Sequence, residues 1–82
     1  MKKILYFSAA WCGPCKTLAP IMEELNGEIV YNKVDVDKDQ ELSMKYGVRN
    51  IPTLILLNEF GEEINRKVGM QSRESILNLY NG

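Results

Sequence analysis

Two cysteines separated by two residues stand between a strand-like run and a helix-like run, and this arrangement constrains the fold more than any other feature. Cys12 and Cys15 follow the apolar stretch 4–7 and precede the amphipathic stretch 16–25. A strand, a tight turn and a helix start place the first sulfur at a helix N-terminus. Unpaired backbone N–H groups and the helix dipole favour a thiolate there. A disulfide that closes only two residues adds little loop-closure stability. The pair is therefore interpreted as a reactive dithiol rather than as a structural staple.

The size and charge of the chain exclude several classes of function. Its 82 residues suffice for one small domain, which we expect to span residues 1–82. Ten basic and eleven acidic residues give a net charge of −1 without a basic patch, so nucleic acid is not an expected ligand. The longest apolar run, 54–57, is far too short to span a bilayer. Two cysteines without any histidine cannot complete a four-ligand zinc site in one chain, and no metal is expected.

The N-terminus carries Lys2 and Lys3 before an apolar stretch, an order that also opens a secretory signal. The apolar stretch ends within about ten residues at the cysteine motif, and cleavage there would destroy the first strand. We interpret the two lysines as solvated charges at the start of that strand. We therefore expect a cytoplasmic protein, in a compartment where thiols stay reduced.

Apolar and polar residues alternate along the chain in a way that predicts the element order β-α-β-α-β-β-α. The third strand is a continuous apolar run, as expected of a central strand covered on both faces. Helices on both faces of one sheet are the natural packing for this order. The predicted strands span 3–7, 29–36, 53–57 and 63–68.

Start and stop signals define the three helices. The first has Pro14 in its first turn, where proline is tolerated best, and ends at 26–27. The second is predicted to start at Asp37, with Gln40 in the capping-box position. Ser72 is predicted to cap the third. The apolar contacts of the second and third helices are predicted to come from Leu42, Met44, Tyr46, Ile76, Leu77 and Tyr80.

Several separate segments carry motifs of one known family: Trp11–Lys16, Ala19–Pro20, Lys33–Asp37, Tyr46–Thr53 and Val68–Gly69. At these places the sequence resembles thioredoxins. The resemblance covers most of the chain and implies a thioredoxin fold, with three α/β/α layers around a four-stranded mixed sheet in the order 2-1-3-4. The chain starts at what is normally the family's central strand, so the resemblance implies an N-terminally shortened, glutaredoxin-sized form of that fold.

The two cysteines are predicted to have different roles. Cys12 is expected to be the nucleophile, because the helix N-terminus favours its thiolate and its position before Pro14 should leave it the more exposed sulfur. Cys15 lies one helical turn deeper on the same face and is expected to resolve the mixed disulfide. Gly13 and Pro14 suit the tight turn and the helix start. In the family that the sequence resembles, this dipeptide is typical of reductants.

Four positions are expected to shape a substrate-docking groove together with Gly13 and Pro14. Trp11 is interpreted either as a core aromatic or as part of a rim that faces the substrate. The resemblance implies a cis bond between Ile51 and Pro52, which would lie against the sulfurs and expose the Ile51 backbone to a substrate strand. Gly69, together with its neighbour Met70, is interpreted either as a third wall of the groove or as a turn glycine beside a core methionine.

Tyr6 and Lys33 are candidates for tuning the pKa of the cysteines. Thioredoxins usually carry a buried aspartate five residues before the motif tryptophan, and Tyr6 occupies that position here. Tyr6 is interpreted either as a core residue that fills the vacated space or as a proton donor. Lys33 is interpreted as a solvated lysine, as the partner of Asp35, or as a cation close enough to the sulfurs to favour a thiolate.

These features predict a protein disulfide reductase that acts by dithiol–disulfide exchange without a bound cofactor. Its expected partners are disulfide-containing proteins and an electron donor of the thioredoxin-reductase type, an NADPH-dependent flavoprotein. We expect a monomer. Three alternatives stay open: a glutaredoxin-like oxidoreductase, an oxidant or isomerase that works outside the cytoplasm, and a non-catalytic binding subunit with the same fold.

Overall fold

The computed structural model describes residues 1–82 and contains four strands and three helices in the predicted order. The third and fourth strands have the predicted bounds. The turn 58–62, which contains Gly61, separates them. Pro52 precedes the third and Gly69 follows the fourth, which makes their ends easy to recognise. The elements are β1 (Lys3–Ser8), α1 (Gly13–Glu24), β2 (Tyr31–Asp35), α2 (Gln40–Lys45), β3 (Thr53–Leu57), β4 (Glu63–Val68) and α3 (Arg73–Asn81).

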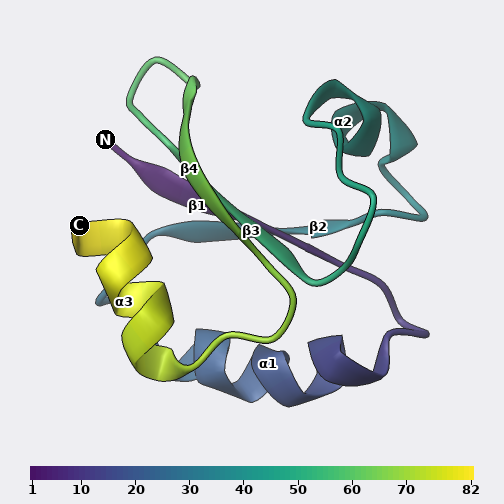
Figure 1. Cartoon of the computed structure of the whole chain (residues 1–82), viewed down its shortest axis with the longest axis horizontal. Coiled ribbons are helices and arrows are strands. Elements are labelled where there is room, and N and C mark those ends of the chain that lie inside the picture. Colours follow the sequence, from purple (N-terminus) through teal and green to yellow (C-terminus); the bar gives the residue numbers. More distant parts are fainter.

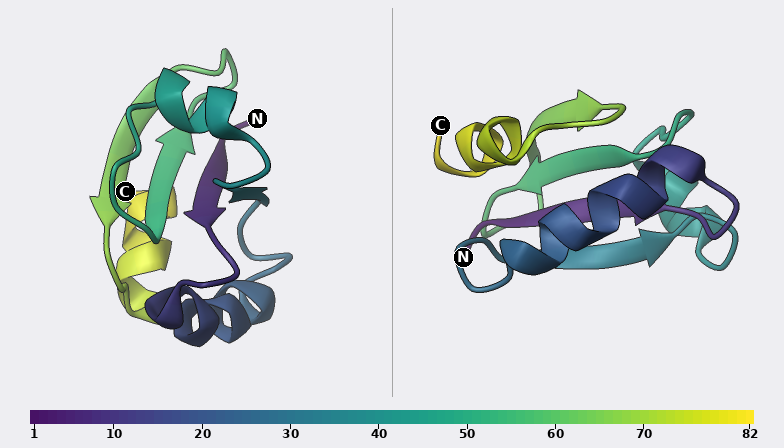
Figure 2. Two further views of the ribbon diagram at one scale, coloured as in Figure 1. Left: turned by 90° about the vertical axis from the view of Figure 1, so that its right-hand side faces the viewer. Right: turned by 90° about the horizontal axis from the view of Figure 1, so that it is seen from below.

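The strands form one mixed sheet in the order β2-β1-β3-β4, which confirms the expected order. β1 runs parallel to β2 and antiparallel to β3, and β4 is antiparallel to β3 at the edge. Helices α1 and α3 cover one face of the sheet and α2 covers the other (Figures 1 and 2). The parallel β1-α1-β2 unit brings the turn after β1, which holds the cysteine motif, to the same sheet end as the end of β2.

The alternation of side chains along β1 and β3 divides the apolar core between the two faces of the sheet. The larger cluster, which includes Tyr6, Leu18 and Leu54, lies on the α1 and α3 side. The smaller cluster, centred on Phe7 and Ile55, packs against residues of α2. Every residue of β3 is buried, as predicted for a central strand with helices on both faces.

The second strand is shorter than predicted and the second helix starts later. Ile29 lies outside β2 and forms only an isolated bridge with Asn26. The predicted cap, Asp37, precedes the helix, because the side chain of Asp39 accepts the backbone N–H of Leu42 and caps α2 instead. The helix therefore begins at Gln40, three residues after the predicted start.

The apolar contacts predicted for the short helices are partly wrong. Met44 is 80% exposed, and the buried residue of α2 is Ser43. The short α2 turns Met44 away from the sheet, whereas Leu42 and Tyr46 pack on the smaller cluster as predicted. In α3, Leu79 joins Ile76 and Tyr80 in the core, and Leu77 packs only partly.

Arg66 of the edge strand ties β4 to the end of α2. Its guanidinium donates to the backbone oxygen of Tyr46 at 2.7 Å and to both carboxylate oxygens of Glu63 at 2.6 Å. The hydrogen bond from Arg66 holds the pKa of Glu63 below its ordinary value, so the ionised carboxylate stabilises the fold. This contribution is present above the ordinary pKa and is lost as the pH falls through the lowered one.

Replacing Glu63 with glutamine is therefore expected to lower the free energy of unfolding at pH 7 by no more than about 1 kcal/mol, because solvent screens this partly exposed pair. The difference from the unmodified protein should disappear when the pH is lowered through the folded-state pKa of Glu63. Urea unfolding at a series of pH values checks this. Glu24→Gln removes the same charge from the last residue of α1 and serves as the control. An equal pH dependence in both variants would contradict the expected role of the ion pair.

Candidate active site

The cysteine motif forms the start of α1. Cys12 is the N-cap residue, and Pro14 lies in the first turn. The turn that leads into the helix is closed by a hydrogen bond from the backbone N–H of Cys12 to the oxygen of Ala9, at 3.2 Å. Cys15 lies inside the helix, and its backbone N–H donates to the sulfur of Cys12 at 3.2 Å. A helix-terminal donor thus points at the first sulfur, as the spacing predicted.

The two cysteines form a disulfide, with their Cα atoms 5.2 Å apart. Each residue is only 4% exposed, so the expectation that Cys12 is the more exposed of the two is wrong for this oxidised state. The reason is packing: the pair forms a small cluster with Ala9, and Val36 and Ile51 pack against that cluster. The cysteine pair therefore lies under an apolar cover rather than in open solvent.

The loop before β3 provides part of that cover. The Ile51-Pro52 peptide bond is cis, which confirms the expectation for this bond. Ile51 is half-buried, and its backbone N–H and C=O have no hydrogen-bond partner within the chain. Gly69 has a φ of +90° and donates its N–H to the oxygen of Pro52 at 2.8 Å. A side chain would be strained at that φ, so glycine suits the loop that abuts Pro52.

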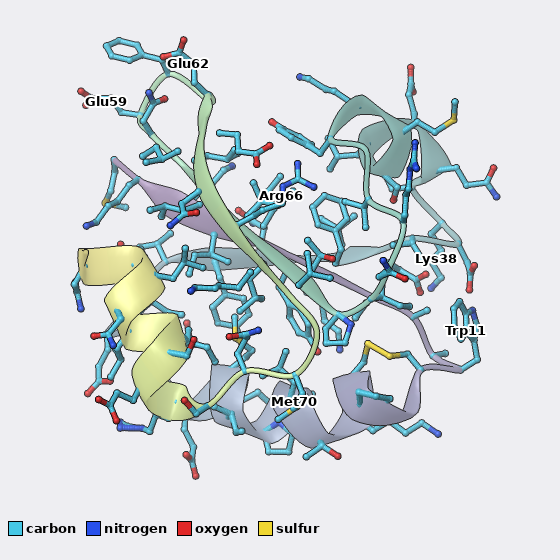
Figure 3. The ribbon with its side chains drawn as sticks, in the orientation of Figure 1. Trp11, Lys38, Glu59, Glu62, Arg66 and Met70 are labelled. Carbon is cyan, nitrogen blue, oxygen red and sulfur yellow. A yellow bond between two sulfur atoms is a disulfide. The ribbon has the colours of Figure 1, made fainter.

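Trp11 stands at the surface beside the disulfide (Figure 3). It is 68% exposed, so it is not a core aromatic, and its indole N–H donates to a carboxylate oxygen of Asp37 at 2.8 Å. This contact was not predicted, because Asp37 was interpreted as a helix start. Met70, on the loop after β4, is 44% exposed and likewise does not belong to the core.

Tyr6 belongs to the larger core cluster and is only 1% exposed, in agreement with the core interpretation. Its hydroxyl donates to the backbone oxygen of Cys15 at 3.1 Å. Burial raises the pKa of Tyr6 above its ordinary value. The ammonium group of Lys33 lies 5.8 Å from the centre of the Tyr6 ring. These contacts place Tyr6 against the backbone of the second cysteine.

A pocket of about 470 Å³ opens beside Cys15, between α1 and the end of β2. Two of its polar residues, Ser8 and Asp35, were not predicted as part of a site, because the register of the β1–β2 pairing that brings them together is not visible in a linear pattern. No group of three or more Cys, Asp or Glu side chains is arranged to hold a metal ion. The pocket is lined by Ser8, Ala9, Ala10, Cys15, Lys16, Ala19, Lys33 and Asp35.

A cysteine pair at the start of a helix, facing a cis-proline loop on a four-stranded mixed sheet, defines the class of thiol–disulfide oxidoreductases with a thioredoxin fold. A thioredoxin family model matches residues 1–81. The thioredoxin of Bacillus subtilis is 46% identical over 79 residues, which cover 92% of this chain and 75% of that relative. The chain belongs to the thioredoxin family, and it is a thiol–disulfide reductase.

Solved structures agree with this assignment. A mutant thioredoxin from Halobacterium salinarum matches with a TM-score of 0.91 and 38% identity, covering 98% of this chain and 72% of that chain. A reduced thioredoxin from Schistosoma mansoni matches with a TM-score of 0.89 and 36% identity, covering 98% of this chain and 76% of that chain. No helix of the present structure is both long and apolar enough to cross a membrane.

Proposed function

We propose that Cys12 is the nucleophile and Cys15 the resolving cysteine of a reductase that acts on disulfides in other proteins. The observation that carries this assignment is the hydrogen bond from the Cys15 backbone N–H to the Cys12 sulfur at 3.2 Å. A thiolate on Cys12 keeps the hydrogen bond from that N–H group, and the positive end of the α1 dipole stabilises its charge. Cys15 lies within the helix, next to the pocket.

In the first step the Cys12 thiolate attacks one sulfur of the substrate disulfide, and the other substrate sulfur leaves as a thiolate. In the second step the Cys15 thiol loses its proton and attacks the Cys12 sulfur. The bond between Cys12 and the substrate breaks, and the second substrate sulfur leaves as a thiolate that takes up a proton. The substrate gains two electrons, and the protein returns to the Cys12–Cys15 disulfide.

The docking groove is proposed to lie between Trp11 and the loops at Ile51 and Gly69, with Gly13 and Pro14 at its floor and Pro52 behind. The free N–H and C=O of Ile51 are suited to pair with an extended substrate segment, as an added strand pairs with a sheet edge. The exposed Trp11 ring offers an apolar surface at the rim.

Replacing Ile51 with alanine is expected to lower kcat/KM for a disulfide-bonded protein by about tenfold, because the side chain packs both on the cysteine cluster and beside the docking backbone. The matched control is Val48→Ala, since Val48 is also half-buried but packs only on the cluster under α2. Urea unfolding of both variants gives the stability effect. An Ile51→Ala variant that loses stability but keeps its kcat/KM would make Ile51 a core residue and contradict the groove.

Lys33 and Tyr6 are proposed to support the cysteines without touching substrate. Lys33 lines the pocket with Cys15, so its positive charge favours a thiolate there. Tyr6 holds the Cys15 carbonyl and thereby fixes the start of α1 against β1. Tyr6 thus acts on the position of Cys15, and Lys33 acts on its charge state.

The proposed electron donor is an NADPH-dependent flavoprotein of the thioredoxin-reductase type, and the proposed setting is a monomer in the cytoplasm that consists of one domain over residues 1–82. The test is a coupled assay with such a reductase, in which this protein should make NADPH oxidation depend on an added protein disulfide. Reduction by glutathione in its place would contradict the proposed donor. Size-exclusion chromatography with light scattering checks the monomer.

A further inference from the structure

The attack of Cys15 on the mixed disulfide requires a group that accepts the proton of the Cys15 thiol. A thiolate, not a thiol, attacks a disulfide, so Cys15 must lose its proton before it can attack the Cys12 sulfur. Cys15 is only 4% exposed, and apolar residues cover the disulfide on the side of Ile51. The pocket between α1 and the end of β2 gives Cys15 another opening. The proton route depends on which group in or near this opening can accept a proton.

Three nearby groups are engaged elsewhere. The Tyr6 hydroxyl donates its hydrogen to the Cys15 oxygen, and its raised pKa shows that burial disfavours the phenolate. Asp37 accepts the indole N–H of Trp11. Asp39 accepts the Leu42 N–H as the cap of α2. None of these three residues lines the pocket beside Cys15.

Asp35 differs from them, because it lines the pocket together with Cys15. One of its carboxylate oxygens accepts the backbone N–H of Asp37 at 2.9 Å, which fixes the side chain, and the other has no hydrogen-bond partner within the chain. Its neighbour across the sheet is Ser8, the last residue of β1, whose hydroxyl side chain also lines the pocket. The other charged groups around this pocket are the ammonium groups of Lys33 and Lys16, neither of which can accept a proton.

We infer that Asp35 accepts the proton of Cys15, through water in this pocket, when Cys15 attacks the mixed disulfide. A pocket of about 470 Å³ is large enough for several water molecules, and it offers them a carboxylate, a hydroxyl and two ammonium groups as partners. Lys33 lies on the same face of β2 two residues earlier and lines the same pocket, so its ammonium group is available to the water molecules between Cys15 and Asp35. Asp35 is thus a positioning residue that acts through water rather than by touching the sulfur.

The step balances without a further reagent. The S–H bond of Cys15 breaks, its proton passes through water to the Asp35 carboxylate, and the Cys15 thiolate forms a bond to the Cys12 sulfur. The bond between Cys12 and the substrate breaks, and the departing substrate thiolate carries the electron pair. The proton on Asp35 then exchanges with solvent at the pocket mouth. When an electron donor opens the Cys12–Cys15 disulfide, the same path returns a proton to Cys15.

Asp35→Asn tests the inference, because the amide oxygen keeps the hydrogen bond from Asp37 but cannot take the proton. The reduced protein is mixed with 5,5′-dithiobis(2-nitrobenzoate) in a stopped-flow spectrometer. The attack of Cys12 releases a first coloured thiolate, and the attack of Cys15 on the mixed disulfide releases a second. The control is Asp39→Asn, which removes the same charge outside the pocket. This variant should keep the cap of α2, because asparagine caps a helix as well as aspartate does.

Asp35→Asn is expected to slow the second phase by at least about tenfold near neutral pH, within the range of lost general-base catalysis, and to leave the first phase within about twofold. The slowed phase should speed up as the pH rises, because hydroxide then removes the proton of Cys15 without help from the carboxylate. Asp35→Glu should restore part of the rate. A merely structural effect would slow both phases and would not vanish with rising pH.

This inference rests on the proposed role of Cys15, and the two can fail separately. Release of only one coloured thiolate by the unmodified protein would refute the resolving role and the proton route with it. Release of both, with a second phase in Asp35→Asn equal to that of the unmodified protein or of Asp39→Asn, would refute the proton route alone.

Discussion

Replacing Cys12 with serine is expected to abolish disulfide reduction, by at least about a thousandfold, as does the removal of other catalytic nucleophiles. Replacing Cys15 with serine should have a different result. Cys12 can still attack in that variant, but no second thiol opens the product, so the protein should accumulate as a covalent mixed disulfide with its substrate. Mass spectrometry of the quenched reaction detects this adduct, and turnover with a disulfide-bonded protein gives the rates.

The pair of variants also separates a reductase from a binding subunit. A binding subunit would keep its partner contacts in both variants and would form no adduct. Serine differs from cysteine only in its chalcogen atom, so circular dichroism of the reduced proteins should show that both variants fold. An adduct in Cys12→Ser and none in Cys15→Ser would reverse the proposed roles of the two cysteines.

Replacing Tyr6 with alanine is expected to cost about 3–5 kcal/mol of unfolding free energy, because it empties a large volume in the main core cluster. That is a large part of the roughly 5–15 kcal/mol that stabilises a typical domain. Tyr6→Phe keeps the ring and loses only the hydrogen bond to the Cys15 oxygen, so it should cost about 1 kcal/mol. Urea unfolding of the oxidised proteins measures both values.

The same variants distinguish the two interpretations of Tyr6. If Tyr6 is a core residue, Tyr6→Phe should keep the rate of the Cys15 step within about threefold. A slowing of that step as large as that of Asp35→Asn would give the Tyr6 hydroxyl a part in the proton transfer and would contradict the core interpretation. Equal stability losses in Tyr6→Ala and Tyr6→Phe would show that the hydroxyl, not the ring, carries the stabilisation.

Elements with unambiguous local signals were predictable from the sequence. β3 is a continuous apolar run and β4 is bounded by turn residues, so both have their predicted bounds. The start of α2 was not predictable in the same way, because Asp37 and Asp39 are both good caps. Packing decides between them: Asp37 pairs with Trp11, and Asp39 is left to cap the helix. The same applies to Met44, whose helical spacing does not reveal which face of a six-residue helix meets the sheet.

The candidate site shows a similar division. The cysteine motif and the cis proline could be predicted because each is a contiguous run of residues. The spacing of the cysteines predicted the motif, and the resemblance to thioredoxins predicted the cis bond. The burial of Cys12 and the pocket beside Cys15 depend on how the end of β2 packs against the start of α1. These segments are about twenty residues apart in the sequence, and only the parallel β1–β2 register brings Asp35 beside Ser8.

The reduction potential of the Cys12–Cys15 pair shows whether the protein works as a reductant. Tryptophan fluorescence reports the redox state, since Trp11 is the only tryptophan and stands beside the disulfide, and a graded thiol/disulfide buffer sets the potential. We expect a value near about −270 mV, which is typical of thioredoxins and fits a reductant. A value near about −180 mV or higher would indicate an oxidant or isomerase and would contradict the reductase mechanism.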